Sequence, residues 1–294
     1  MSILKNVKLA DYTSWIIGGE AEYFCLPTTV DELKEALQFV KQNQLPVAIL
    51  GGGSNVLVSD QGVPGMTICL RRFSEISTEI KNDRIYINCL SGTGKSELLK
   101  VFLKNQLAPA LFLAGLPGDV GGGVVMNAGV AEAFMPREFM ELVDAIEVMN
   151  LDGEIKKIEK SELNVRYRHT DGWQPDIVIR TFMSWPLEKD LSILQKVRDA
   201  NKVRLSKQPL DMPSCGSVFK NPEGHKAAQL IDQCGLKGFR IGDAQVSLKH
   251  ANFIVNLDQA KASDILNVIL HVQKTVLEKT GIQLTNEVVK LGQF

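Results

Sequence analysis

The chain has 294 residues, of which 45% are hydrophobic, and its 33 Lys and Arg nearly balance its 34 Asp and Glu. This length can bury the core of one large domain or of two to three smaller ones. The near-neutral charge does not indicate a nucleic-acid surface, and no apolar run approaches the roughly 20 residues that a membrane helix needs. We therefore expect a soluble enzyme that binds neither nucleic acid nor membrane.

The predicted elements mix helices and strands along the chain. Strands are expected at 22–26, 47–50, 56–58, 66–70, 84–90, 145–149, 154–158 and 177–185, near 246, and at 253–255 and 287–289. Helices are expected from Thr29 and at 96–105, 190–202, 226–234 and 263–280. Thr29 and Glu32 have the spacing of a capping box. No internal repeat interrupts this α+β order.

Several turn signals support these elements. Asp152-Gly153 predicts a tight hairpin between two strands. Gly235 and Gly281 are predicted to follow the ends of two helices, where a left-handed residue is common.

Two glycine-rich loops indicate a cofactor. Residues 115–129 include six glycines among apolar side chains, which predicts an ordered, partly buried loop and not a flexible linker. Residues 51–55, Gly-Gly-Gly-Ser-Asn, follow a short buried strand and offer consecutive backbone N–H groups that suit a phosphate or pyrophosphate. The two loops together predict a dinucleotide held at two points. The alternative for each loop is a tight turn between buried strands.

A third loop, residues 91–96, lies between a strand and a helix as a phosphate-binding P-loop would. The P-loop pattern needs a glycine five residues before Gly94, and that position is Cys89. We therefore predict a structural role for this loop, with Ser96 capping the following helix.

A polar segment bounded by Pro213 and Pro222 contains Ser217, close to Lys220 and Asn221. Its sequence does not fit Gly-x-Ser-x-Gly, so we predict no hydrolase elbow there. A serine near a lysine and a bound cofactor could donate a proton, and a simple turn serine is the alternative.

The cysteines and histidines carry no metal signature. The five cysteines lack Cys-x-x-Cys spacing, and the four histidines share no metal-ligand spacing. These spacings predict no metal site. No secretory signal is evident in the first residues, so reduced thiols and a cytoplasmic location are expected.

Taken in order, these motifs resemble the UDP-N-acetylenolpyruvoylglucosamine reductase family. The matching segments are 17–24, 50–57, 115–129, 167–170, 216–222, 235–238, 249–256 and 287–288. The resemblance implies an α+β protein of the shorter form, with a two-part FAD-binding domain of the vanillyl-alcohol-oxidase (PCMH) type and a smaller α+β substrate-binding domain. The implied boundaries are 1–70, 71–200 and 201–294, and the last few residues are compatible with a return to the FAD-binding part.

The family's activity implies a flavin-dependent reduction in peptidoglycan precursor synthesis. NADPH reduces non-covalent FAD, and the enolpyruvyl group of UDP-N-acetylglucosamine enolpyruvate is then reduced to UDP-N-acetylmuramate, with NADPH and the UDP-sugar alternating in one cleft. The implied catalytic residues are Ser217 as proton donor, Arg168 and Glu287. The implied FAD-binding residues are Gly51, Gly52, Gly53, Ser54, Asn55, Gly115, Pro117, Gly118, Gly121, Gly122, Asn127 and Gly129. Lys220, Asn221 and Gln229 are the implied substrate-binding residues.

Some positions depart from the family pattern. Thr170 replaces the usual serine, Cys215 the usual alanine and Asn286 the usual proline, while Val130-Ala131-Glu132 follows Gly129. The place of the histidine that links flavin covalently in some relatives is taken by Ser54-Asn55, which favours non-covalent FAD. The alternatives are another FAD-dependent oxidoreductase on the same scaffold and a non-enzymatic nucleotide-sensing protein.

Overall fold

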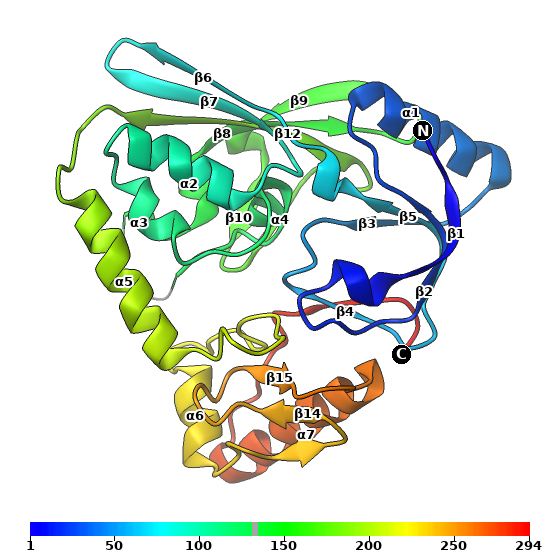
Figure 1. The fold of residues 1–294 in the computed structure, drawn as a ribbon, viewed down its shortest axis with the longest axis vertical. Helices are drawn as coiled ribbons and strands as arrows, with labels where there is room; N and C mark the ends of the chain where they lie inside the picture. Colours follow the sequence, from blue (N-terminus) through cyan, green and yellow to red (C-terminus); the bar gives the residue numbers. More distant parts are fainter. Residues whose placement is uncertain (131–134) are drawn as a thin grey trace. The chain divides into compact units, whose positions relative to one another are not determined.

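The computed structural model describes residues 1–130 and 135–294, which divide into two units (Figure 1). Unit 1 consists of Met1–Leu4, Phe24–Gly52 and Met66–Val203, and unit 2 consists of Lys5–Tyr23, Gly53–Gly65 and Arg204–Phe294. Residues 5–23 and 53–65, which lie in the predicted first part of the FAD-binding domain, are thus grouped with the C-terminal third. Strands β1 (Leu4–Lys8), β2 (Glu20–Cys25) and β5 (Val63–Cys69) each run from one unit into the other.

An antiparallel sheet in the order β6-β7-β12-β8-β9 organises unit 1. Its strands are β6 (Ile76–Lys81), β7 (Arg84–Leu90), β8 (Val143–Met149), β9 (Ile155–Glu159) and β12 (Ile177–Pro186). Helices α2 (Lys95–Lys104), α3 (Pro109–Leu113) and α4 (Val120–Val125) lie together beside this sheet (Figure 1). Alternate residues of β7, Ile85 and Ile87, are buried with Leu98 and Phe102 of α2 in one apolar core, as expected for a strand with one covered face.

Unit 1 also contains further helices, strands and turns. They are α1 (Val30–Asn43), β3 (Val47–Leu50), the hairpin of β10 (Asn164–Arg166) and β11 (His169–Asp171), most of α5 (Ile193–Lys207), and short 3-10 turns at Leu70–Arg72, Phe139–Glu141 and Lys160–Glu162. Strand β3 pairs in parallel with the second half of β5, and Leu50 lies opposite Cys69. The first glycine loop, residues 51–55, therefore starts at the carboxyl end of a parallel strand. The expectation that this strand is buried is wrong for most of it, because only Leu50 is buried and Ile49 is exposed.

Unit 2 is built on α7 (Ala262–Thr280). The helix buries one stripe of residues spaced by three and four positions, namely Ile265, Val268, Ile269, Val272 and Val276. Unit 2 also contains a 3-10 turn at Leu9–Tyr12, α6 (Ala227–Gln233), the antiparallel strands β13 (Arg240–Ile241), β14 (Ala244–Val246) and β15 (Ile254–Asn256), and the parallel pair of β4 (Val56–Val58) and β16 (Val289–Leu291).

Long-range contacts explain why unit 2 includes N-terminal segments. The indole nitrogen of Trp15 donates to the carbonyl of Ile254 at 2.7 Å, and the side chain of Asn256 donates to the carbonyl of Trp15 at 3.0 Å. Strand β16 pairs in parallel with β4 of the same unit, so the last strand of the chain lies beside a segment from residues 53–65.

Several local predictions are confirmed. The hairpin at Asp152-Gly153 joins β8 and β9, and Gly153 has φ +79°. Gly235 and Gly281 follow α6 and α7 with φ +74° and +73°. The helix expected at 190–202 is present as α5, shifted to Ile193–Lys207.

Two cap predictions need correction. The hydroxyl of Thr29 accepts from the N–H of Glu32 at 3.2 Å, but the carboxylate of Glu32 accepts instead from the N–H and hydroxyl of Thr28, because Thr28 offers two donors. Ser96 does not cap α2. Its N-cap is Gly94, because the backbone of Gly94 pairs with Asp119 and the N–H of Lys95 donates to Gly118.

The five cysteines are free and buried. Among the described residues, none of the helices combines the length and the apolar character needed to cross a membrane.

Candidate functional site

The second glycine loop, residues 115–129, is ordered and partly buried, as predicted. Its centre forms α4, with Asp119 as the N-cap. The N–H of Val120 donates to Thr93 at 2.9 Å, and that of Gly121 donates to Ser91 at 2.8 Å. These two amides thus bind carbonyls of the third glycine loop, residues 91–96.

Two glycines are required by close packing, and a third, Gly52, lies in a tight contact. A Cβ at Gly121 would lie 2.8 Å from the Cβ of Ser91, and one at Gly123 would lie 2.8 Å from the ring of Phe139. At Gly52 it would lie 3.1 Å from the Cα of Gly118. The last contact shows that the two glycine loops approach each other directly within unit 1.

Asp119 connects these loops. One carboxylate oxygen accepts from the N–H of Gly122 at 2.7 Å, and the other accepts from the N–H of Gly52. The guanidinium of Arg71 donates to the carbonyl of Gly52 at 3.2 Å. The predicted FAD-binding residues Gly51, Gly52, Gly118, Gly121 and Gly122 therefore lie in one small region of unit 1, with Gly115 and Pro117 on the approach to α4.

The rest of the first loop lies in unit 2. The carbonyl of Gly53, which has φ +69°, accepts from the N–H of Ser14 at 3.0 Å. The side-chain amide of Asn55 donates to the carbonyl of Glu287 at 3.0 Å. Within residues 1–130 and 135–294, no acceptor reaches the backbone N–H of Gly53 or Ser54. Two adjacent unpaired amides in a glycine loop fit the phosphates of a dinucleotide.

Arg168 is buried, which excludes a simple surface role for this arginine. It lies in the turn between β10 and β11, with φ +54° and 7% exposure. Its guanidinium donates to the carbonyl of Gly129 at 2.7 Å, lies 3.7 Å from a carboxylate oxygen of Glu138, and is 4.7 Å above the ring of Tyr167. The positive charge is therefore held rigidly next to the end of the second glycine loop.

Asn127 organises this region. Its side-chain amide donates to Glu138 at 2.6 Å and to the carbonyl of Arg166 at 3.0 Å, and its oxygen accepts from the N–H of Met140 at 3.1 Å. These contacts join the second glycine loop to the Arg168 hairpin. Nothing in the sequence around Glu138 indicates that its carboxylate contacts both Asn127 and Arg168. Residues 131–134, which include Ala131 and Glu132 of the departure after Gly129, lie outside the described residues.

Thr170, on β11, is one of three buried threonines of unit 1 whose hydroxyls lack a hydrogen-bond partner among the described residues, with Thr67 and Thr181. Thr170 is 1% exposed. Buried hydroxyls are normally paired, so an orphan hydroxyl two residues from Arg168 agrees with a bound ligand or water nearby.

The segments that carry Ser217 and Glu287 lie side by side in unit 2. The carbonyl of Val218 accepts from the N–H of Glu287 at 2.8 Å, and Phe219 pairs with Asn286 as an antiparallel bridge. Asn286 also accepts from the side chain of Gln273 at 3.0 Å, so the departure from proline adds a contact. Two residues that are 70 positions apart thus lie on neighbouring segments.

The predicted substrate residues occupy the same part of unit 2. The backbone N–H of Lys220 donates to Thr285 at 2.9 Å. The side chain of Asn221 accepts from the N–H of Ala227 at 3.0 Å and so caps α6. Gln229 is exposed on α6. Cys215 is 3% exposed, with its sulfur 3.6 Å from the carbonyl of Val56, and burial raises the pKa of its thiol to about 12.

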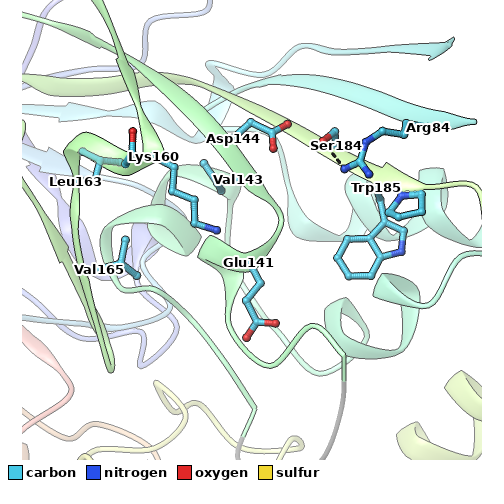
Figure 2. Close-up of a pocket in the computed structure, with 11 residues that line it drawn as sticks. Arg84, Glu141, Val143, Asp144, Lys160, Leu163, Val165, Ser184 and Trp185 are labelled. Carbon is cyan, nitrogen blue, oxygen red and sulfur yellow. Dashed lines mark hydrogen bonds between the residues drawn. The ribbon is translucent and has the colours of Figure 1, made fainter. Parts of the chain in front are cut away.

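A separate hollow of about 840 Å³ opens on unit 1 (Figure 2). Leu163, Val165 and Trp185 contribute apolar surface to it, and the guanidinium of Arg84 donates to the hydroxyl of Ser184 at 2.9 Å. None of the predicted site residues lines this hollow, so it is distinct from the candidate site.

Comparison with known proteins identifies the family. Residues 21–159 match the family described as FAD binding domain, and residues 208–291 match the UDP-N-acetylenolpyruvoylglucosamine reductase C-terminal domain. The reductase of Listeria innocua is 41% identical over 294 residues, covering 100% of this chain and 96% of that protein. The reductase of Levilactobacillus brevis is 38% identical, covering 100% of this chain and 94% of that protein.

A solved structure agrees. The crystal structure of the reductase from Thermus caldophilus matches with a TM-score of 0.78 and 34% identity, covering 99% of each chain. The fold is thus the predicted α+β fold, with an FAD-binding part followed by the family's C-terminal domain. The chain belongs to the UDP-N-acetylenolpyruvoylglucosamine reductase family of FAD-dependent oxidoreductases.

Proposed function

We propose that the chain uses NADPH and non-covalent FAD to reduce the enolpyruvyl group of UDP-N-acetylglucosamine enolpyruvate to UDP-N-acetylmuramate, a step of peptidoglycan precursor synthesis. The observation that supports the proposal is the hydrogen bond between the N–H of Glu287 and the carbonyl of Val218, the residue that follows Ser217. Bound FAD supplies the hydride for the substrate double bond after its own reduction by NADPH. The residues of the chain must then stabilise negative charge and deliver a proton.

Arg168 is proposed to stabilise the developing charge near the substrate carboxylate. Its guanidinium is permanently charged and is already oriented by Gly129 and Glu138, so little reorganisation is needed during the reaction. Losing one such preorganised group typically costs roughly 10²–10³ in rate.

Ser217 is proposed to donate the proton, and Glu287 to support the enolate by hydrogen bonding. A free serine is a weak acid, so Ser217 needs nearby positive charge, for which Lys220 on the same segment is the candidate. Among the described residues, the hydroxyl of Ser217 has no hydrogen-bond partner, which leaves it available to a substrate. Lys220, Asn221 and Gln229 are proposed to contact the uridine diphosphate, in a cleft that NADPH and substrate use alternately.

The test separates the two half-reactions in the Ser217→Ala variant. Reduction of the bound flavin by NADPH should keep its rate, because that step does not need the serine proton. Reoxidation by the enolpyruvyl substrate should slow by about 10²–10⁴, the usual contribution of a general acid. Rapid-mixing absorbance under anaerobic conditions measures both rates.

Ser214→Ala is the matched control, because Ser214 lies on the same segment but pairs through its backbone with Val255. Both half-reactions should be normal in that variant. If Ser217→Ala slowed both halves equally, Ser217 would position the flavin and would not be the acid.

A further inference from the structure

A buried carboxylate joins the two glycine loops of unit 1. Asp119 is 5% exposed, and its two oxygens accept from the N–H groups of Gly122 and Gly52. These hydrogen bonds are charge-assisted, so they are stronger than those between neutral groups. The carboxylate thus fixes residues 51–52 against residues 118–122, which the sequence separates by about 65 positions.

A buried cation supports the same region from the third glycine loop. Lys95 is 4% exposed, and its ammonium donates to the carbonyl of Pro117 at 2.9 Å and lies 5.8 Å from the ring centre of Phe139. Burial lowers the pKa of Lys95 to about 8, and the charge of Asp119 acts in the opposite direction. A lysine is rarely buried unless a paired group or a function retains it.

The backbone strengthens the same connection. The N–H of Lys95 donates to Gly118 at 3.0 Å, and Gly94 pairs with Asp119 as an antiparallel bridge. The third loop therefore holds the second glycine loop through both its main chain and its lysine.

We propose that Asp119 and Lys95 form a loop clamp, a pair of positioning residues that holds the two glycine loops in the conformation that binds FAD. Preformed loops lose less conformational entropy when a ligand binds, so the clamp should increase FAD affinity. Without Asp119, the amides of Gly52 and Gly122 would lose their acceptor, and the two loops would separate more easily. The proposal rests on FAD binding and does not depend on the identity of the reduced substrate.

The test measures FAD binding in the absence of NADPH and substrate. The flavin is removed from the purified protein, and FAD is titrated back while quenching of its fluorescence is followed. Asp119→Ala should raise the dissociation constant at least tenfold, whereas Asp119→Asn, which retains one acceptor, should have an intermediate effect. Lys95→Met should also weaken binding. In the double variant that combines Asp119→Asn with Lys95→Met, the two effects on the FAD dissociation constant should be less than additive, because both residues hold the same loops.

Thr29→Ala is the matched control, because Thr29 caps α1 of the same unit far along the chain from the glycine loops. It should lower the thermal midpoint of the apoprotein and leave the FAD dissociation constant unchanged. If Asp119→Ala lowered only the midpoint, or if the effects of Asp119→Asn and Lys95→Met on FAD binding simply added, the clamp would be overturned. Should Asp119→Ala fail to fold, Asp119→Asn carries the same comparison.

Discussion

The backbone N–H of Glu287 donates to the carbonyl of Val218 with 2.8 Å between nitrogen and oxygen. This hydrogen bond places Glu287 beside the segment that carries Ser217, and the side chain of Asn55 binds the carbonyl of Glu287 from the other direction. The backbone at Glu287 is therefore held by two parts of the chain. A small change in the length of the Glu287 side chain should therefore lower kcat.

Glu287 is expected to act as a hydrogen-bond donor to the developing enolate. Glu287→Gln keeps a donor at the same reach and should lose less than about tenfold in kcat, whereas Glu287→Asp moves the group by about 1 Å and should lose about 10²-fold. Steady-state kinetics with NADPH and the enolpyruvyl substrate measures both. A Gln variant far worse than the Asp variant would mean that the carboxyl itself transfers a proton, and the role of acid would pass from Ser217 to Glu287.

Arg168→Lys should reduce kcat/KM by about 10²–10³ because lysine keeps the charge but cannot reproduce the contacts of the guanidinium with Gly129 and Glu138. Arg166→Lys on the same hairpin is the control, since Arg166 is exposed and pairs with Asp171. Kinetics on both variants gives the comparison. Equal activity of the two variants would remove Arg168 from the reaction.

Gly121→Ala should destabilise the protein more than Gly122→Ala. The new methyl group at 121 would meet the Cβ of Ser91 and lie 3.1 Å from its carbonyl oxygen, whereas at 122 it would meet only the end of the Asp119 side chain at 2.9 Å. Overpacking against a backbone typically costs about 1–3 kcal/mol. Urea unfolding measures both free energies, and the reverse order would show that the cap by Asp119 matters more than the packing at Ser91.

The stability of the protein should depend on Lys95 at alkaline pH. Burial lowers the pKa of Lys95 to about 8 in the folded chain, against 10.5 ordinarily. Between these values the unfolded chain binds the extra proton, so the contribution of Lys95 to the free energy of unfolding should rise with pH, by at most about 1.4 kcal/mol per pH unit. Below pH 8 both states are protonated and this contribution should be constant.

The measurement is the difference in unfolding free energy between the wild-type protein and Lys95→Met across this range. Lys104→Met, at the exposed end of α2, is the control and should give a constant difference. A constant difference for Lys95→Met as well would mean that the ammonium does not titrate in this window.

The sequence alone predicted the features that depend on neighbouring residues. The turn at Asp152-Gly153 and the helix ends at Gly235 and Gly281 were predictable because a left-handed residue is recognisable from glycine in its local context. The prediction that Ser96 caps α2 was wrong because the start of this helix depends on a distant residue. Gly94 pairs with Asp119, which lies 25 residues further along the chain.

In the candidate site, too, the sequence predicted some features and the tertiary structure decided others. The chemistry of Arg168, Ser217 and Glu287 could be proposed from the motifs, because residue type and order along the chain are sufficient to indicate the family. The burial of Arg168 against Glu138, the bridging carboxylate of Asp119 and the buried ammonium of Lys95 were decided only by the tertiary structure. Each depends on which distant segments pack together, and neither residue type nor local periodicity specifies that partner.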